Sequence, residues 1–258
     1  MLGVTPSMTM SERERSTLKL AAGFTLYWLV CLRLDAQSTA ITQAFIGLTT
    51  WTFLAGVLRF SPWEERIQVV TMIGVATFFE CLFSLIWGAY EYRLGNLPIY
   101  VPPGHGLFYY TALRLAELSF LRRHSRLIVL CVFMGSAALL ARNLWSAPLS
   151  EMSDMLGLVS WVIFIPFILR ERFALLYAVS FTMTMALEFY GTSLGVWTWA
   201  PILPWLRLSV ANPPACVGAG YCIFDAITRW LAPRAHGVLR RKLSATQVKS
   251  ERWRKNYT

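Results

Sequence analysis

Residues 80–110, ECLFSLIWGAYEYRLGNLPIYVPPGHGLFYY, contain the pattern that decides the fold. Glu80 lies inside an apolar run, and a Gly-x-Tyr-x-Tyr motif follows it at residues 88–92. A polar turn then leads to a proline pair at 102–103 and to His105, where the next apolar run begins. Two apolar segments joined by a polar turn, with an acid inside the first, predict membrane helices that enclose a functional group.

The composition of the whole chain agrees with a membrane protein. Of its 258 residues, 56% are hydrophobic and only 15% are charged, whereas a typical soluble domain has about 25% charged residues. The 11 tryptophans and 10 tyrosines are typical of aromatic belts at membrane interfaces. We therefore expect a polytopic membrane protein.

Apolar segments recur along the chain at lengths near the ~20 residues that cross a bilayer. They cover residues 19–33, 41–59, 67–88, 102–120, 127–145, 154–170, 173–191 and 210–231. The predicted fold class is an all-α transmembrane helical bundle of about eight spans. It is flanked by an N-terminal tail, 1–18, and a basic C-terminal tail, 232–258.

The distribution of positive charge predicts the orientation. Arginines concentrate in alternate loops, which the positive-inside rule assigns to the cytoplasm. These residues are Arg59, Arg66, Arg122, Arg123, Arg126, Arg170 and Arg172. We expect a multi-pass protein of a bacterial-type inner membrane, with both termini cytoplasmic.

The net charge of +10 raises the question of a nucleic-acid partner. No recognition motif accompanies the charge, so we expect none. The basic C-terminal tail is instead predicted to lie on anionic lipid headgroups. The expected partners are membrane lipid and a lipophilic small molecule, and the sequence identifies no protein partner.

A second copy of the opening pattern indicates an internal repeat. Glu188 precedes a Gly-x-Trp-x-Trp motif at residues 195–199. The acid-to-glycine intervals are 88 − 80 = 8 and 195 − 188 = 7, and a second proline pair follows at 213–214. Because four spans per half is an even number, we expect two parallel four-helix repeats, 19–126 and 127–231.

Glu80 and Glu188 are the main candidates for catalytic residues. An ionisable residue at mid-membrane costs about 2.5–3.5 kcal/mol on insertion scales, so a functional role is the default hypothesis. Small and polar residues at helical spacing predict that both acids face other helices. An apolar pocket favours a neutral carboxyl group that can donate a proton. An interhelical hydrogen bond that fixes packing is equally open.

His105 is the third catalytic candidate, because it lies at the mouth of an apolar segment. An acid/base or substrate-orienting role and a capping role at this helix end are both open. A metal site needs several histidine, cysteine or carboxylate ligands together. We therefore expect no metal and no cofactor.

Three further charged residues are predicted to form a structural ion pair. Arg114 and Glu117 lie three residues apart on one apolar segment, so they face the same side of a helix. Asp225, at the matching position of the second repeat, is the alternative partner of Arg114. By helical rotation, Arg114 faces away from His105.

Four aromatic residues, Tyr90, Tyr92, Trp197 and Trp199, are candidates for substrate binding. They belong to the two motifs that follow the acids. A belt position at the membrane interface explains their residue type. The functional alternative is an aromatic wall that stabilises positive charge on a substrate through cation–π attraction.

The order of these motifs resembles the carotenoid hydratase family. The resemblance rests on Glu80, the motif at 88–92, the segment LGNLPIYVP at 94–102, the motif at 195–199 and Asn212. It implies a membrane enzyme of carotenoid biosynthesis that adds water to a terminal isoprene double bond. It also implies a glutamate as the acid, the aromatic residues as walls for a carbocation, and Asn212 as a substrate-binding residue.

The expected function is therefore an enzyme that protonates an alkene of an isoprenoid or carotenoid-type substrate. Hydration, cyclisation and isomerisation all begin in this way and stay open. A transporter of small molecules or lipids is the first alternative, because parallel repeats with inward acids suit one. The second is a non-catalytic membrane subunit of a complex.

Overall fold

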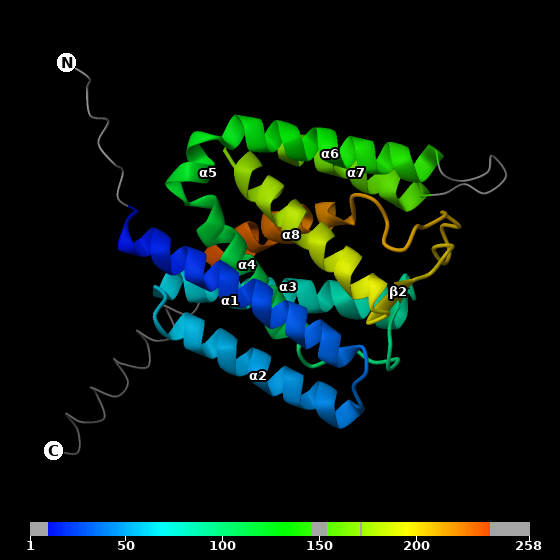
Figure 1. Cartoon of the computed structure of the whole chain (residues 1–258), viewed down its shortest axis with the longest axis horizontal. Helices are drawn as coiled ribbons and strands as arrows, with labels where there is room; N and C mark the ends of the chain where they lie inside the picture. The colour runs from blue at the N-terminus through cyan, green and yellow to red at the C-terminus, as the bar shows by residue number, and fades with distance from the viewer. Residues whose placement is uncertain (1–9, 146–153, 171, 238–258) are drawn as a thin grey trace.

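The computed structural model describes residues 10–145, 154–170 and 172–237, and these residues are mostly helical (Figure 1). In chain order the elements are α1 (Glu12–Asp35), α2 (Ala40–Arg59), α3 (Trp63–Glu80), the π-helical turn η1 (Cys81–Ile86), β1 (Tyr90–Tyr92), α4 (Val101–Ala116), α5 (Ser119–Arg123), α6 (Ser125–Trp145), α7 (Met155–Ile168), α8 (Ala174–Ser193), β2 (Trp197–Trp199) and the 3₁₀ helix η2 (Val217–Ala219). A further helix over residues 220–237, here the C-terminal helix, follows η2.

The helices mark the chain as a membrane protein. Among the described residues, five helices are long and apolar enough to cross a bilayer: α1, α2, α3 continued by η1, α6 and α8. Their outer faces carry large exposed apolar side chains, which include Leu26, Ile41, Phe45, Phe78 and Leu127. Such faces suit contact with lipid.

The first helix begins earlier than the sequence predicted. We expected residues 1–18 to form a tail, but α1 begins at Glu12. Ser11 and Glu14 form a capping box, in which each side chain bonds the backbone N–H of the other residue. This pair satisfies two N–H groups at the helix end and extends α1 into the polar segment.

The central element of the bundle is α4, against which α1, α2, α3 and α8 all pack. Two of its glycines permit this close approach. A Cβ atom at Gly104 would lie 2.7 Å from the Trp28 ring of α1, and one at Gly106 would lie 2.8 Å from Ile73 of α3. His105 lies between these two contacts, so its ring is held on a tightly packed helix.

A two-stranded antiparallel sheet joins the ends of α3 and α8, and the prediction of helices alone did not include it. Tyr90 pairs with Trp199, and Tyr92 pairs with Trp197. Gly88 and Gly195 precede the strands with φ values of +70° and +68°, which glycine adopts without steric cost. The sheet thus places the two aromatic motifs side by side.

Candidate functional site

Glu80 accepts hydrogen bonds on both of its carboxylate oxygens. Tyr90 and Tyr92 donate their hydroxyls to Oε2 over 2.6 and 2.9 Å. Nε2 of His105 lies 2.9 Å from Oε1. The other ring nitrogen of His105, Nδ1, forms a short hydrogen bond with the hydroxyl of Tyr221. Glu80, His105 and Tyr221 therefore form a continuous polar chain.

Glu188 has a matching arrangement, but its donors are indoles. The Nε1 groups of Trp197 and Trp199 both donate to Oε2, over 2.9 and 3.0 Å. Gly191 makes this possible, because a Cβ atom at that position would overlap the Trp197 ring. The rings of Trp199 and Tyr90 pack with their centroids 4.7 Å apart. The two carboxyl groups are thus linked through one pair of touching rings.

Both acids line one cavity of about 370 Å³. Its walls are mostly aromatic and aliphatic, and they come from α1, the end of α3, η1, β1, α4, α7, α8, β2, η2, the C-terminal helix and the loops next to these elements. All seven residues predicted as catalytic or as aromatic walls line it: Glu80, Tyr90, Tyr92, His105, Glu188, Trp197 and Trp199. The sequence predicted that both acids face the interior of the bundle, and in the structure both face this cavity.

The tyrosines of β1 serve this site as neutral hydrogen-bond donors. Both are buried, at 8% and 6% exposure for Tyr90 and Tyr92. Burial, together with the nearby Glu80 carboxylate, raises the pKa of each phenol well above its usual range. Their hydroxyl protons therefore stay in place across the physiological pH range.

Sequence reasoning missed Tyr221, which both lines the cavity and bonds His105. The available signal was its spacing from Asp225. Residues four apart share a face of a helix, and Asp225 was predicted as an alternative partner of Arg114 on another helix. The ring of Tyr221 also packs on Phe108, with centroids 4.1 Å apart, so its hydroxyl is fixed in position.

Asn212, predicted to bind substrate, is not among the residues that line the cavity. Its side chain is exposed to the outside, and its Oδ1 accepts the backbone N–H of Trp199 over 3.1 Å. The physical reason is that β2 has only one partner strand, so this N–H needs an acceptor from elsewhere. Asn212 positions Trp199.

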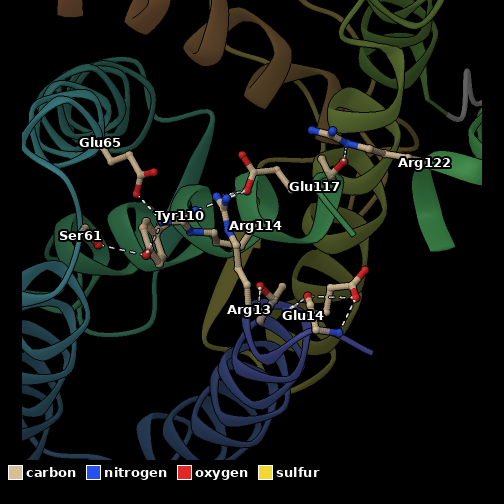
Figure 2. Close-up of polar contacts among 11 residues, drawn as sticks. Arg13, Glu14, Ser61, Glu65, Tyr110, Arg114, Glu117 and Arg122 are labelled. Carbon is tan, nitrogen blue, oxygen red and sulfur yellow. Dashed lines mark hydrogen bonds and ion pairs between the residues drawn. The ribbon is translucent and has the colours of Figure 1, made fainter. Parts of the chain in front are cut away.

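Arg114 lies in the last turn of α4 and is not among the residues that line the cavity. Figure 2 shows its polar contacts, which include Glu65 and Glu117. The predicted pair with Glu117 is present at 3.4 Å, but the closer acid is Glu65 of α3, at 2.5 Å. The hydroxyl of Tyr110 accepts a further bond from Arg114 over 3.0 Å. Arg13 of α1 also contacts Glu117, at 2.7 Å. This cluster connects α1, α3 and α4.

Asp225 is not the partner of Arg114, so that alternative is wrong. It pairs with Arg229, one turn further along the C-terminal helix, at 2.6 Å. Tyr109 donates its hydroxyl to the other oxygen over 2.6 Å, and Gln68 donates to Tyr109 over 2.7 Å. Arg229 lies four residues after Asp225, where side chains share one face of a helix, so it is the acid's ion-pair partner.

Comparisons with family models, with curated proteins and with solved structures each found no match. Within residues 10–145, 154–170 and 172–237, no three His, Cys, Asp or Glu side chains gather closely enough to hold a metal ion. Two carboxyl groups and an imidazole, enclosed by rings, suit proton transfer to and from an apolar molecule.

Proposed function

We propose that this protein is a membrane enzyme that protonates an alkene of a lipophilic, isoprenoid-type substrate. One observation supports the proposal: two glutamates with different partners line the same aromatic cavity. Such a site supplies the acid, the base and the walls that a carbocation reaction requires. Function as a hydratase, a cyclase or an isomerase is compatible with it.

We assign the role of acid to Glu188. Its two donors are indole N–H groups, which cannot accept a proton. In the proposed step the Glu188 proton moves to one alkene carbon, the π bond breaks, and positive charge forms on the other carbon. The faces of Tyr90 and Trp199 then stabilise this charge through cation–π attraction.

We assign the role of base to Glu80, together with His105 and Tyr221. In hydration, water adds to the cation and its proton passes to this chain. In cyclisation or isomerisation, a carbon next to the cation loses the proton instead. Tyr221 and His105 can each both donate and accept, so the chain can return a proton toward the cavity and restore the acid.

The resemblance to the carotenoid hydratase family belongs to the same proposal. The two aromatic motifs on which it rests form β1 and β2, and they supply most of the donors to the two acids. In this proposal, a carotenoid-type substrate enters the apolar cavity from the lipid. The hydration of a terminal isoprene double bond is the specific reaction that this resemblance suggests.

We further propose eight spans in two parallel repeats, with both termini cytoplasmic in a bacterial-type inner membrane. Each of the eight predicted segments overlaps a helix of the structure, although residues 210–216 of the last segment are not helical. Each acid accepts hydrogen bonds from the two aromatic residues of its own strand, and two corresponding strands that pair antiparallel are what a twofold axis between them produces. Of the predicted C-terminal tail, residues 238–258 lie outside the described part.

Mass spectrometry of total lipid and pigment extracts tests the reaction. Four strains are compared: one without the gene, one complemented by it, one with E80Q and E188Q together, and one with E117Q. Glu117 is a matched acid outside the cavity. We expect a species shifted by the mass of water, or an isomer shifted in retention, in the complemented and E117Q strains only. Identical extracts from all four strains would refute the proposed enzymatic function.

Transport of a small lipophilic molecule is the second candidate function. The observation that favours it is the position of the cavity, which lies between the two matched motifs and is lined from both. Transporters of repeated architecture bind their substrates at such interfaces. A transporter would move its substrate chemically unchanged, and its activity in proteoliposomes would follow an ion gradient.

A further inference from the structure

The charge of the cavity is opposite to that of the chain. The whole sequence has 24 lysines and arginines against 14 aspartates and glutamates. Among the described residues that line the cavity, however, Glu80 and Glu188 are present and no lysine or arginine is. A carboxylate in such an apolar enclosure interacts with a cation far more strongly than one in water. The cavity therefore disfavours anions and attracts cations.

One carboxylate oxygen in the cavity is free to meet a ligand. Both oxygens of Glu80 are taken, Oε1 by His105 and Oε2 by two tyrosines. At Glu188 both indole donors share Oε2. Its Oε1 accepts no hydrogen bond from the described residues. A positive group at Oε1 would supply the missing partner.

Aromatic rings lie next to the Glu188 carboxyl group, because Trp197 and Trp199 both donate to its other oxygen. The rings of Tyr90 and Trp199 lie 4.7 Å apart, and those of Tyr92 and Trp197 lie 6.2 Å apart. Their polar ends point at the two acids, so the remaining surface of each ring is apolar and rich in π electrons. A cation within about 6 Å of such a ring centroid is attracted to it.

The cavity also has room for an alkyl chain and a route for it into the bilayer. Two of its lining residues, Val159 of α7 and Leu206, are 40% and 59% exposed on the outer surface. A residue that lines a cavity and faces outward marks the edge of an opening. Phe83 and Phe224 also line the cavity and add to its apolar wall.

We propose that the cavity is a binding site for lipophilic cations of the alkylammonium type. The positive head group lies at Oε1 of Glu188, against the rings of Tyr90 and Trp199, and the alkyl chain leaves past Val159 toward lipid. The inference rests on the charge and shape of the cavity and does not require the proposed reaction. The cation binds the ionised form of Glu188, which in the proposed reaction is its state after it has protonated the alkene. A cation bound in this way resembles the carbocation and would also inhibit the enzyme.

Isothermal titration calorimetry of the full chain in zwitterionic lipid nanodiscs tests this site. The probes are decyltrimethylammonium and decyl sulfate, which share a chain length and differ in the sign of the head group. Empty nanodiscs give the baseline for partitioning into lipid. We expect saturable binding of decyltrimethylammonium to one site, and for decyl sulfate only the heat seen with empty nanodiscs.

Variants locate the binding. E188Q should weaken decyltrimethylammonium binding at least tenfold, while E117Q, outside the cavity, should leave it unchanged. W199L removes one ring and should weaken binding severalfold; it serves as the second test should E188Q fail to fold. Equal binding of the two probes, or unchanged binding in folded E188Q, would overturn the inference. Cation binding together with identical lipid extracts in all four strains would support the cation site and refute the proposed enzyme. A changed lipid extract without cation binding would support the enzyme and refute the cation site.

Discussion

The contact between Gly191 and Trp197 offers a sharp test of how the site is built. An alanine at position 191 would place its Cβ inside the Trp197 ring, so the indole must move away from Glu188. Overpacking of this kind costs about 1–3 kcal/mol, and the lost hydrogen bond adds about 1 kcal/mol. The higher helix propensity of alanine offsets about 1 kcal/mol.

The expected net loss for G191A is therefore about 1–3 kcal/mol of unfolding free energy, which lowers the thermal midpoint by about 2–12 °C in a chain of this size. Thermal unfolding in detergent at a fixed scan rate, followed by circular dichroism, measures it. Gly74 of α3 is the matched control, because a Cβ there meets nothing within 4 Å. G74A should be neutral or slightly stabilising.

Decyltrimethylammonium binding supplies a second, independent measurement for the same pair of variants. Displacement of the Trp197 indole removes one of the two donors to Glu188 and changes one wall of the cavity. G191A should therefore bind the cation several times more weakly, and G74A should bind it normally. A G191A protein that matches G74A in both stability and affinity would refute the reasoning.

Three further substitutions test the buried polar contacts. D154A should destabilise the protein by about 3 kcal/mol or more, measured by thermal unfolding, since Asp154 accepts from three backbone N–H groups that would lose their acceptor. Y221F should leave the fold intact but change the ¹⁵N shifts of His105, whose Nδ1 loses its partner; unchanged shifts would contradict the contact. D225N should cost about 2 kcal/mol of stability, less than the ~3–5 kcal/mol of a fully buried pair, because the Arg229 side chain is 29% exposed.

The helices were predictable because their signal is local. Each depends on a run of apolar residues, and each of the eight predicted runs overlaps a helix, although residues 210–216 of the last run are not helical. Among the described residues, five helices are long and apolar enough to cross a membrane. The start of α1 was predicted too late, since the prediction used hydropathy and overlooked the capping box of Ser11 and Glu14. The strands β1 and β2 were not predicted, because three residues are too few for a pattern and their pairing joins segments over a hundred residues apart.

The composition of the site was predictable to a similar degree. The cost of placing Glu80 and Glu188 in apolar segments marked them as inward-facing, and the spacing of the aromatic motifs placed their rings nearby. The contacts between helices were not predictable. The pairing of Arg114 with Glu65 and the bond from Tyr109 to Asp225 depend on which helices are neighbours, and the contact of Tyr221 with His105 depends on the packing of the C-terminal helix against α4.

The difference between the two acids follows from the residue types of the two strands. A tyrosine hydroxyl both donates and accepts, whereas an indole N–H only donates. Glu80, with tyrosines and His105 around it, is therefore connected to groups that can carry a proton. Glu188, held by two indoles, has no such connection among the described residues, so a proton on it can leave only into the cavity. Replacing Trp199 by tyrosine would give Glu188 a neighbour that can accept its proton. The substitution should therefore shorten the lifetime of the Glu188 proton, which is measured by hydrogen–deuterium exchange of the carboxyl band in infrared spectra. An unchanged exchange rate would show that the indoles do not isolate this acid.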